Sequence, residues 1–366
     1  MKSTPTRRTV PQIFVNGTLL ILCLLWLVPT FGLFVSSFRT RDDILTTGWW
    51  EIAPHRKWVT VDTLAPPPDI DRTKPMEFNG VSGTFEEFRL GLPIADGRRI
   101  IWVGNRRAGK VQVQELQWAA FPTFTLQNYA DVLTGKNYEV VDADGVKHTR
   151  RGDNLFGAFL NSLAVTIPSV AIPVTIAAFA AYGFAWMRFP GRKAIFAVVV
   201  ALLVVPLQIA LVPVLTDYVH LKLNGTYLAI WLAHTGFGLP LAIYLLYNYI
   251  SSLPRDIMEA AVVDGASHFT IFARLIIPLS APALASYAIF QFLWVWNDYL
   301  VALIFIGSQP DVQVITMRLA EIVGSRGNDW HLLTAGAFIS MVLPLAVFFS
   351  LQRYFVRGLL AGSVKS

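Results

Sequence analysis

Long apolar runs separated by short polar connections occupy most of the chain. The run AIFAVVVALLVVPLQIALVPVL (194–215) carries no charged residue, and it is longer than the roughly 20 residues that cross the hydrocarbon layer of a bilayer. A helix that is apolar on every face is typical of a membrane span and not of a soluble domain. The runs do not alternate in polarity as barrel strands do, so we expect helical spans.

The pattern predicts an all-α polytopic membrane protein with six transmembrane helices. The predicted spans are 13–38, 155–187, 194–218, 226–250, 283–306 and 332–355. We expect Pro206, Pro213 and Pro240 to bend the helices that contain them. The first run is too long for the apolar part of a signal peptide, and no small-residue cleavage site closes it, so we expect an uncleaved span.

The basic residues of the short connections predict the orientation, because Lys and Arg concentrate in cytoplasmic loops. With the N-terminus inside, only three basic residues lie in the short outer loops: Lys222, Arg318 and Arg326. The inner segments then hold Lys2, Arg7, Arg8, Arg188, Arg192, Lys193, Arg255, Arg274, Arg353, Arg357 and Lys365. We therefore expect both termini in the cytoplasm.

Residues 39–152 then form a long extracytoplasmic insertion between the first two spans. The segment RRIIWVGNRRAGKVQVQEL (98–116) predicts two β-rich runs around a Gly/Asn turn. The segment LAPPPDIDRTKP (64–75) is typical of a loop or linker. We expect a small β-rich module, and the alternative is a loosely ordered loop that only connects two spans.

The longest cytoplasmic loop, 251–282, predicts two short helices between the fourth and fifth spans. Ser252 is a candidate cap for the first helix, with Pro254 in its first turn. Gly265 is expected to end that helix in a left-handed conformation. Ser267 starts the second helix, which we expect Pro278 to end. The alternative is a membrane-surface helix that merely links two spans.

This loop carries the sequence EAAVVDGASHFTIFARLIIPLSAP (259–282), which resembles the cytoplasmic signature of permease subunits in ATP-binding cassette importers. The resemblance extends from about Phe159 to the C-terminus. It includes FLNSLAV (159–165), RFPGRK (188–193), QFLWVWNDYL (291–300), GSQPDVQ (307–313) and QRYFVRGLLAGSVKS (352–366). These segments are similar to the maltose-type carbohydrate importer permeases, and the long outer insertion is similar to that of α-glucoside permeases.

The resemblance implies a helix that couples this chain to an ATPase. The residues implied to contact or position the ATPase are Glu259, Ala260, Ala261, Asp264, Gly265, Ala266 and Phe272. In that arrangement Glu259 pairs with a basic group of the partner, Gly265 permits a close approach, and Asp264 caps the second helix. The family also implies that the C-terminal tail lies between the ATPase subunits and that 307–330 contributes a loop that reaches a binding protein.

The same resemblance implies four kinds of partner. They are a dimer of ATPase subunits, a second permease subunit that forms a heterodimer with this chain, an extracytoplasmic sugar-binding protein and the lipid bilayer. No stretch of the sequence fits the phosphate-binding pattern G-x-x-x-x-G-K-[ST]. We therefore expect no cofactor in this chain, with ATP and Mg on the partner ATPase, and no enzymatic activity of its own. The implied location is the bacterial plasma (inner) membrane.

Polar side chains within apolar runs are candidates for the translocation path, because unpaired polar groups are costly in lipid. The polar residues in or at the ends of the runs are Asn161, Gln208, His234, Gln291, Asn297 and Asp298. Of these we assign Gln291, Asn297 and Asp298 to the path, together with Trp294. Trp294 belongs to a cluster with Phe292 and Trp296 that suits stacking on a sugar. The alternative for each is hydrogen bonding or packing between helices.

Composition agrees with this interpretation and excludes several others. Hydrophobic residues make up 54% of the 366 residues and charged residues only 15%, against about 25% charged in ordinary soluble proteins. The net charge of +6 comes from dispersed residues, so we expect no nucleic-acid partner. Cys23 is the only cysteine, which excludes an intrachain disulfide and a cysteine metal site.

The predicted organisation is therefore a cytoplasmic tail (1–12), a first span (13–38), an extracytoplasmic insertion (39–152), a five-helix core (153–356) and a cytoplasmic tail (357–366). The function expected is the permease subunit of an ATP-driven, binding-protein-dependent importer of an oligosaccharide or α-glucoside. Two alternatives remain open. One is a membrane sensor with an extracytoplasmic domain, and the other is a proton-coupled transporter that uses Asp298 or His234.

Overall fold

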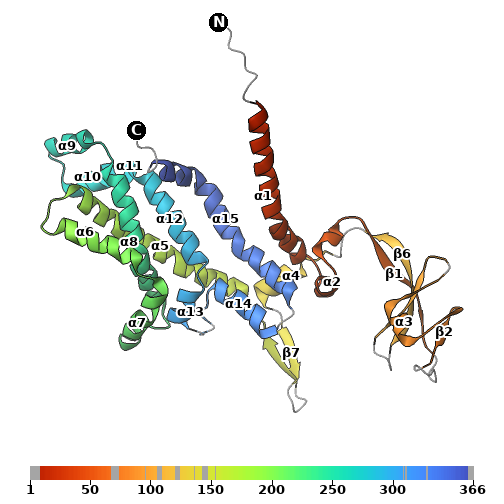
Figure 1. Ribbon diagram of the computed structural model, residues 1–366. Helices are drawn as coiled ribbons and strands as arrows, with labels where there is room; N and C mark the ends of the chain where they lie inside the picture. The colour runs from red at the N-terminus through yellow and green to blue at the C-terminus, as the bar shows by residue number, and fades with distance from the viewer. Residues whose placement is uncertain are drawn as a thin grey trace, which may run out of the picture. The chain divides into compact units, whose positions relative to one another are not determined.

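The computed structural model describes residues 9–66, 74–94, 96–104, 109–119, 124–135, 137–141, 147–152, 154–307, 309, 311–326 and 329–361. The chain divides into two compact units, residues 1–125 and 126–366. Figure 1 shows the helices and strands of both units, and each unit has its own hydrophobic core. Most of the predicted linker 64–75 and the end of the predicted C-terminal tail lie outside the described residues.

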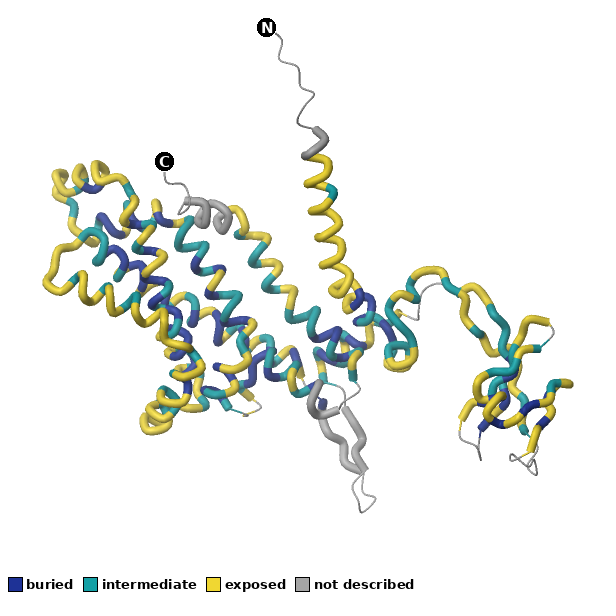
Figure 2. The backbone as a smooth tube through the Cα atoms, viewed as in Figure 1, coloured by how far each residue is buried: buried dark blue, intermediate teal, exposed yellow. Residues whose placement is uncertain are grey.

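The first unit begins with the long helix α1 (Thr9–Ser37). Its described side chains are exposed around almost the whole circumference, as Figure 2 shows. Large apolar groups such as Trp26 and Phe14 are 85% and 76% exposed. A helix that is apolar on every face needs lipid or another helix around it, and Gln12–Ser37 is long and apolar enough to cross a membrane.

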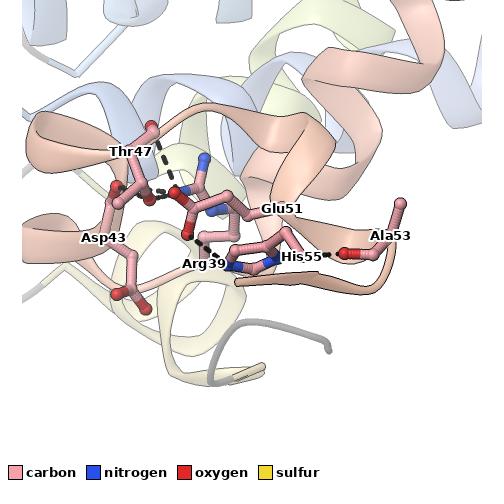
Figure 3. A network of polar contacts seen from close by, with 6 residues as sticks. All are labelled: Arg39, Asp43, Thr47, Glu51, Ala53 and His55. Carbon is pink, nitrogen blue, oxygen red and sulfur yellow. Dashed lines mark hydrogen bonds and ion pairs between the residues drawn. The ribbon is translucent and has the colours of Figure 1, made fainter. Parts of the chain in front are cut away.

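A buried arginine organises the chain where α1 ends (Figure 3). The Arg39 guanidinium donates hydrogen bonds to the carbonyl oxygen of Asp43 at 2.7 Å and to the carbonyl and hydroxyl oxygens of Thr47. It thereby satisfies carbonyls at the end of the short helix α2 (Arg41–Thr46). Burial lowers the pKa of Arg39 from its ordinary value, and the Asp43 and Glu51 carboxylates act in the opposite direction.

The chain then forms an antiparallel sheet and returns to this point. A 3-10 turn, η1 (Trp49–Ile52), leads into the sheet, whose strand order is β1-β6-β5-β4. These strands are β1 (His55–Leu64), β4 (Leu92–Pro93), β5 (Arg99–Val103) and β6 (Lys110–Ala119). Strands β5 and β6 lie in the segment with two predicted β-rich runs. After β6, the Thr125 amide donates to the Phe38 carbonyl at 2.7 Å, so the two ends of the segment meet.

One face of the sheet carries the core of this unit. The hairpin of β2 (Met76–Phe78) and β3 (Val81–Gly83) and the helix α3 (Phe85–Leu90) supply its other side. Phe88 and Ile100 are fully buried there. Thr84 and Glu87 form a reciprocal cap at the start of α3, and the hydrogen bonds from Thr84 hold the pKa of the Glu87 carboxyl below its ordinary value.

The second unit is a helical bundle with one small β-hairpin. Its first elements are α4 (Gln127–Thr134), β7 (Asn137–Val141), β8 (Lys147–Arg151), α5 (Leu155–Trp186), α6 (Arg192–Ala201), η2 (Leu202–Val204), α7 (Leu207–His220) and α8 (Tyr227–Ser251). They are followed by α9 (Arg255–Val263), α10 (His268–Ile271), η3 (Phe272–Ile276), α11 (Ile277–Leu279), α12 (Ala281–Trp296), α13 (Leu300–Ile306), α14 (Ile315–Arg326) and α15 (Trp330–Ala361).

Helices α5 and α8 lie side by side at the centre of the bundle, and α12 packs against both of them and against α15. Small residues form the contact between α5 and α8: Ala177 and Ala181 on one side and Ala242 on the other are completely buried. Small side chains let two helix backbones approach closely, which is the usual basis of packing between membrane helices. Apolar side chains on the outer faces of these helices are exposed (Figure 2).

The structure corrects the third predicted span. Instead of one helix over 194–218, the chain forms α6 with η2 and then α7, bent by 106° at Val205 and Pro206. Proline disfavours a helical conformation in the residue before it, and Val205 is extended (φ −70°, ψ 117°). The bend expected at Pro206 is confirmed, whereas Pro213 and Pro240 lie inside helices that continue without a break.

The fifth predicted span is also wrong as a single helix over 283–306. Helix α12 ends at Trp296, and α13 is a separate helix that begins at Leu300. The helical path before α12 starts earlier, at His268, with a bend of 72° before Ala281. The described residues therefore contain four helices that could each cross a membrane, or up to six spans if each bent pair counts as one.

Candidate functional site

The loop predicted to bind an ATPase forms a short helix at one end of the bundle, α9 (Figure 1). Ser252 does not cap it, contrary to expectation. Its hydroxyl instead donates to the Tyr249 carbonyl at 2.7 Å, at the end of α8. Pro254 precedes the first helical residue, Arg255, and fixes φ near the helical value without needing a hydrogen-bond partner for an amide.

Gly265 ends α9 in the left-handed conformation that the sequence predicts, with φ +74°. The Gly265 amide donates to the Val262 carbonyl at 3.0 Å and the Ala266 amide to the Ala261 carbonyl at 3.0 Å. These two bonds form a Schellman motif, which satisfies carbonyls left free at a helix end. The signature residues Ala261, Gly265 and Ala266 thus have a local structural role.

The second helix of the loop begins as predicted and ends differently. The Ser267 hydroxyl accepts a hydrogen bond from the Thr270 amide at 3.2 Å, so Ser267 is the cap and the expected cap at Asp264 is wrong. Pro278 does not end the helix. A π-helical turn, η3, precedes it and α11 runs through it to Leu279. A π-turn shifts the hydrogen-bond register, which accommodates a residue without an amide proton.

Aromatic and apolar contacts anchor this loop to the bundle. The Phe272 ring stacks on Phe179 of α5, with centroids 4.2 Å apart and an interplanar angle of 22°. The Tyr182 hydroxyl lies 3.0 Å from Nδ1 of His268. Met258 of α9 is buried in the same core as Phe272. Met258, Ile271 and Phe272 of this loop therefore belong to one close-packed core with residues of α5 and α8.

The seven signature residues fall into two groups. Glu259, Ala260, Asp264 and Gly265 are exposed, whereas Ala261 and Ala266 are half-buried and Phe272 is buried. Large apolar side chains lie exposed near the first group, with Val263 at 86% and Phe269 at 69%. The exposed surface of α9 and the turn after it therefore combines a carboxylate with apolar groups, a composition typical of a protein contact.

Gln291, assigned to the translocation path, lies at the centre of a buried polar cluster. Its amide nitrogen donates to the carbonyls of Ser169 at 3.2 Å and His234 at 3.4 Å. The Tyr287 hydroxyl lies 2.9 Å from both the Gln291 side-chain oxygen and the Gly238 carbonyl. These bonds join α5, α8 and α12, so Gln291 has the interhelical role that was the alternative for the polar residues.

Trp294 lines a cavity of about 400 Å³ beside the break between η2 and α7. The cavity is mainly apolar, and Gln291, Gly236 and Phe237 also lie in its wall. The predicted aromatic cluster does not converge here: Phe292 stacks on Trp296, whose indole nitrogen donates to the Ser340 carbonyl at 3.0 Å. Of the three aromatic residues, Trp294 is the one in the cavity wall.

Asn297 and Asp298 have structural bonds at the turn between α12 and α13. The Asn297 amide donates to Leu293 in its own helix at 2.8 Å. The Asp298 carboxylate accepts from the amides of Val301 at 3.3 Å and Ala302 at 2.9 Å, which caps α13. One Asp298 oxygen also lies 3.8 Å from Nε2 of the buried His234. The structure thus brings Gln291 and Trp294 together in the cavity, without Asn297 and Asp298.

Asn161 and Ser162 of α5 hold the segment before α14. The Asn161 amide donates to the carbonyls of Asp311 at 2.9 Å and Gln313 at 3.0 Å, and the Ser162 hydroxyl accepts from the Ile315 amide at 2.8 Å. Much of the segment 307–330, predicted as a loop, is therefore helical and tied to the bundle. No sequence pattern singles out Ser162, because one serine in an apolar run is compatible with many roles.

Metal binding has no support in the described part of the chain, where no group of three His, Cys, Asp or Glu side chains gathers. Tyr287 and Gly238 were missed in the sequence although both belong to the buried cluster. A Cβ atom added to Gly238 would lie 2.8 Å from the Gln291 side chain and 2.9 Å from the Tyr287 hydroxyl. Only their proximity in the folded chain reveals why position 238 requires glycine.

Comparison with known proteins identifies the family. Residues 159–360, more than half of the chain, match the family model of the binding-protein-dependent transport system inner membrane component. The osmoprotective compounds uptake permease protein GgtD of Synechocystis is 48% identical over 96% of this chain and 92% of its own length. The alpha-glucoside transport system permease protein AglG of Rhizobium meliloti is 46% identical over 99% of both chains.

Among solved structures, a bacterial ABC transporter involved in the import of the acidic polysaccharide alginate aligns with a TM-score of 0.45 and 16% identity, over 55% of this chain and 79% of its own. The range matched by the family model, 159–360, includes α9 and the residues that line the cavity. The chain belongs to the family of binding-protein-dependent transport system inner membrane components.

Proposed function

We propose that the chain is the permease subunit of an ATP-driven, binding-protein-dependent importer of an oligosaccharide or α-glucoside. The observation that carries this proposal is the 46% identity to an alpha-glucoside transport permease over 99% of both chains. The relative with 48% identity takes up osmoprotective compounds, so a small osmoprotective solute is the second candidate. The chain has no catalytic role, and ATP and Mg bind to a separate ATPase subunit.

The exposed part of α9 is the surface we assign to the ATPase. Glu259 forms an ion pair with a basic group of that subunit, while Ala260 and Gly265 allow a close approach. The buried signature residue Phe272 does not reach the ATPase in this arrangement; it fixes the loop to α5 by stacking on Phe179. Closure of an ATPase dimer then moves α9, and the packed contacts carry that movement to α5 and α8.

The remaining proposals concern topology and partners. The chain lies in the bacterial inner membrane with six spans, two of them bent, and with both termini in the cytoplasm. The segment between α1 and α5 lies outside the membrane. A second permease subunit packs against the exposed apolar faces, and solute passes along the cavity at Gln291 and Trp294. A soluble sugar-binding protein delivers the solute from outside.

Reconstitution tests this function. The chain, its companion permease and the ATPase are placed in vesicles, and uptake of radiolabelled maltose, trehalose, sucrose and glucosylglycerol is measured with the cognate binding protein. We expect uptake of one of these solutes that requires both ATP and the binding protein. Uptake that proceeds without ATP and responds to a proton gradient would refute the proposal.

Substitution of Asp298 distinguishes ATP-driven transport from the proton-coupled alternative. The two amides donate to different Asp298 oxygens, and Asn keeps one of these acceptors, so Asp298→Asn should retain part of the cap and most ATP-driven uptake. Asp298→Ala removes the cap, at a cost of about 1 kcal/mol, and should lower the thermal midpoint of the purified complex. If the protein were a proton-coupled transporter, the Asp298→Asn variant would lose uptake because Asn cannot ionise. Its thermal midpoint would nevertheless stay close to that of the wild type.

A further inference from the structure

One face of the sheet in the first unit carries two tryptophans and three basic side chains. In an antiparallel sheet, directly paired residues lie on the same face. The register pairs Arg56 with Trp118 and Arg99 with Gln114, and Gln114 also pairs with Thr60, two residues after Trp58. Lys110 lies on this face two residues before Gln112. We call this the Arg-Trp face. It carries Arg56, Trp58, Arg99, Lys110 and Trp118 together with the uncharged Thr60, Gln112, Gln114 and Leu116.

The carboxylates of these strands lie on the other face. Asp62 pairs with the buried Val113, and Glu115 pairs with Val59, whose neighbours Trp58 and Thr60 belong to the Arg-Trp face. Among the described residues of β1, β5 and β6, no acidic side chain lies on the Arg-Trp face. The charged side chains of this face are therefore all basic, while the opposite face carries the core of the unit.

The two arginines are held in place by stacking. The Arg99 guanidinium lies 4.4 Å from the Trp58 ring centroid, and its Nε donates to the Gln114 side-chain oxygen at 2.9 Å. The Arg56 guanidinium lies 5.5 Å from the ring centroid of Trp118, which is 72% exposed. Stacking uses the flat face of a guanidinium and leaves N–H groups at its edge for bidentate contact with a carboxylate.

These guanidiniums lack a counter-charge within the described chain. No carboxylate among the described residues forms an ion pair with Arg56 or Arg99. Burial lowers the pKa of Arg99 from its ordinary value, and no acidic neighbour opposes this effect. Stacked arginines beside exposed tryptophan are typical of the centre of a protein interface.

We propose that the Arg-Trp face docks an acidic surface of the soluble binding protein that serves this importer. The inference rests on the proposed function, since it names a partner that the importer requires. The charged side chains of the face are all basic, and a basic face pairs with an acidic partner surface. Beside the Arg99–Trp58 pair, on the side away from Arg56 and Trp118, lies a ladder of hydrogen bonds that joins Thr60, Gln112 and Gln114. Amide and hydroxyl groups lose hydrogen bonds to water when acyl chains cover them. A protein surface, which can replace those bonds, is therefore a better partner for this face than the lipid interior.

Direct binding tests this proposal independently of transport. The fluorescently labelled binding protein is titrated with the detergent-solubilised transporter, and anisotropy gives the dissociation constant. We expect the double variant Arg56→Glu/Arg99→Glu to raise that constant at least about tenfold, since like charges meet where opposite charges paired. Arg56→Gln/Arg99→Gln keeps long polar side chains on the sheet and should give a smaller increase.

Lys57→Glu is the matched control. It makes the same charge change on the same strand, but Lys57 alternates with Arg56 and Trp58 and so lies on the opposite face. We expect its dissociation constant to stay within about twofold of the wild-type value. An equal increase in this control, an unchanged constant in both double variants, or no binding by the wild-type transporter would overturn the proposal.

A second arm separates protein from lipid. The same titration in nanodiscs of phosphatidylcholine alone should reproduce the difference between variants and wild type. A difference that appears only with anionic phosphatidylglycerol would mean that the face binds lipid, and would overturn the proposal. Loss of ATP-dependent uptake in the wild-type vesicles, with binding intact, would instead contradict the proposed function.

Discussion

Gly265→Asp is expected to abolish ATP-driven uptake while the chain still inserts and assembles in the membrane. A Cβ atom at position 265 would meet no other atom of the described chain within 4 Å. Asp tolerates the left-handed conformation of this residue (φ +74°) better than most side chains do. The folded bundle therefore accepts the substitution at the cost of about 1–2 kcal/mol of local strain.

The effect arises at the proposed contact with the ATPase. The new carboxylate stands on the exposed turn that ends α9, the helix that also exposes Glu259 and Ala260, where a docked subunit would bury it. An unpaired buried charge costs about 3–5 kcal/mol, which corresponds to a loss of roughly two to four orders of magnitude in binding. Uptake into vesicles and copurification of the ATPase both measure this loss.

Gly191→Asp provides a matched control for the backbone effect. Gly191 has φ +76°, and a Cβ atom there would make only an ordinary contact, 3.8 Å from Ile195. It is the N-cap residue of α6 and is not one of the signature residues of α9. We expect Gly191→Asp to retain most of the uptake. Equal loss in both variants would show that strain, and not docking, explains the effect of Gly265→Asp.

Gly265→Asn separates charge from size. It has the shape of the aspartate variant and tolerates left-handed backbone equally well. If the charge is decisive, uptake should recover partly in Gly265→Asn. If the close approach alone is decisive, the two variants should behave alike. Normal uptake by Gly265→Asp would rule out docking at this turn.

The sequence predicted the helices whose apolar runs are unbroken. Helices α1, α5, α8 and α15 match predicted spans because hydropathy reports a long lipid-facing segment directly. Hydropathy does not report the direction of the helix axis. The apolar run over 194–218 therefore predicted one helix, although the chain bends by 106° between η2 and α7. The backbone restriction imposed by Pro206 on Val205 was the available signal, but Pro240 carries the same signal inside a continuous helix.

The candidate site shows the same division between local and tertiary information. The left-handed Gly265 and the cap at Ser267 depend on a few neighbouring residues, and both predictions are confirmed. Phe272 was assigned to the ATPase contact, yet its ring stacks on Phe179, 93 positions earlier in the chain. Spacing alone cannot tell which face of a short helix the bundle covers. The same reasoning applies to Asp298, which caps a helix that the sequence had merged into a span.

Gly238→Val is expected to prevent stable folding of the bundle. The first added carbon would lie 2.8 Å from the Gln291 side chain and 2.9 Å from the Tyr287 hydroxyl. Gln291 and Tyr287 are 0% and 2% exposed, so neither can move aside into solvent. Overpacking of this kind costs about 1–3 kcal/mol, and each buried hydrogen bond broken adds about 1–3 kcal/mol.

Size-exclusion chromatography of the detergent-solubilised complex after heating measures this effect. We expect little monodisperse Gly238→Val protein, with a thermal midpoint well below that of the wild type. An unchanged midpoint would contradict the packing of α8 against α12 through this cluster. Tyr287→Phe, which loses one hydroxyl and adds no volume, should give an intermediate midpoint, because it breaks the bonds without the clash.

Gly236→Val is the matched control, and it also tests the cavity. It makes the same change two residues earlier on α8, where an added Cβ atom would meet nothing within 4 Å. The midpoint should therefore stay near the wild-type value. Because Gly236 lies in the cavity wall, its new side chain narrows the space beside Trp294, and uptake should fall although the bundle is intact. Normal stability with normal uptake in Gly236→Val would show that the solute does not pass through the cavity. Reduced uptake at normal stability would place the solute path in the cavity.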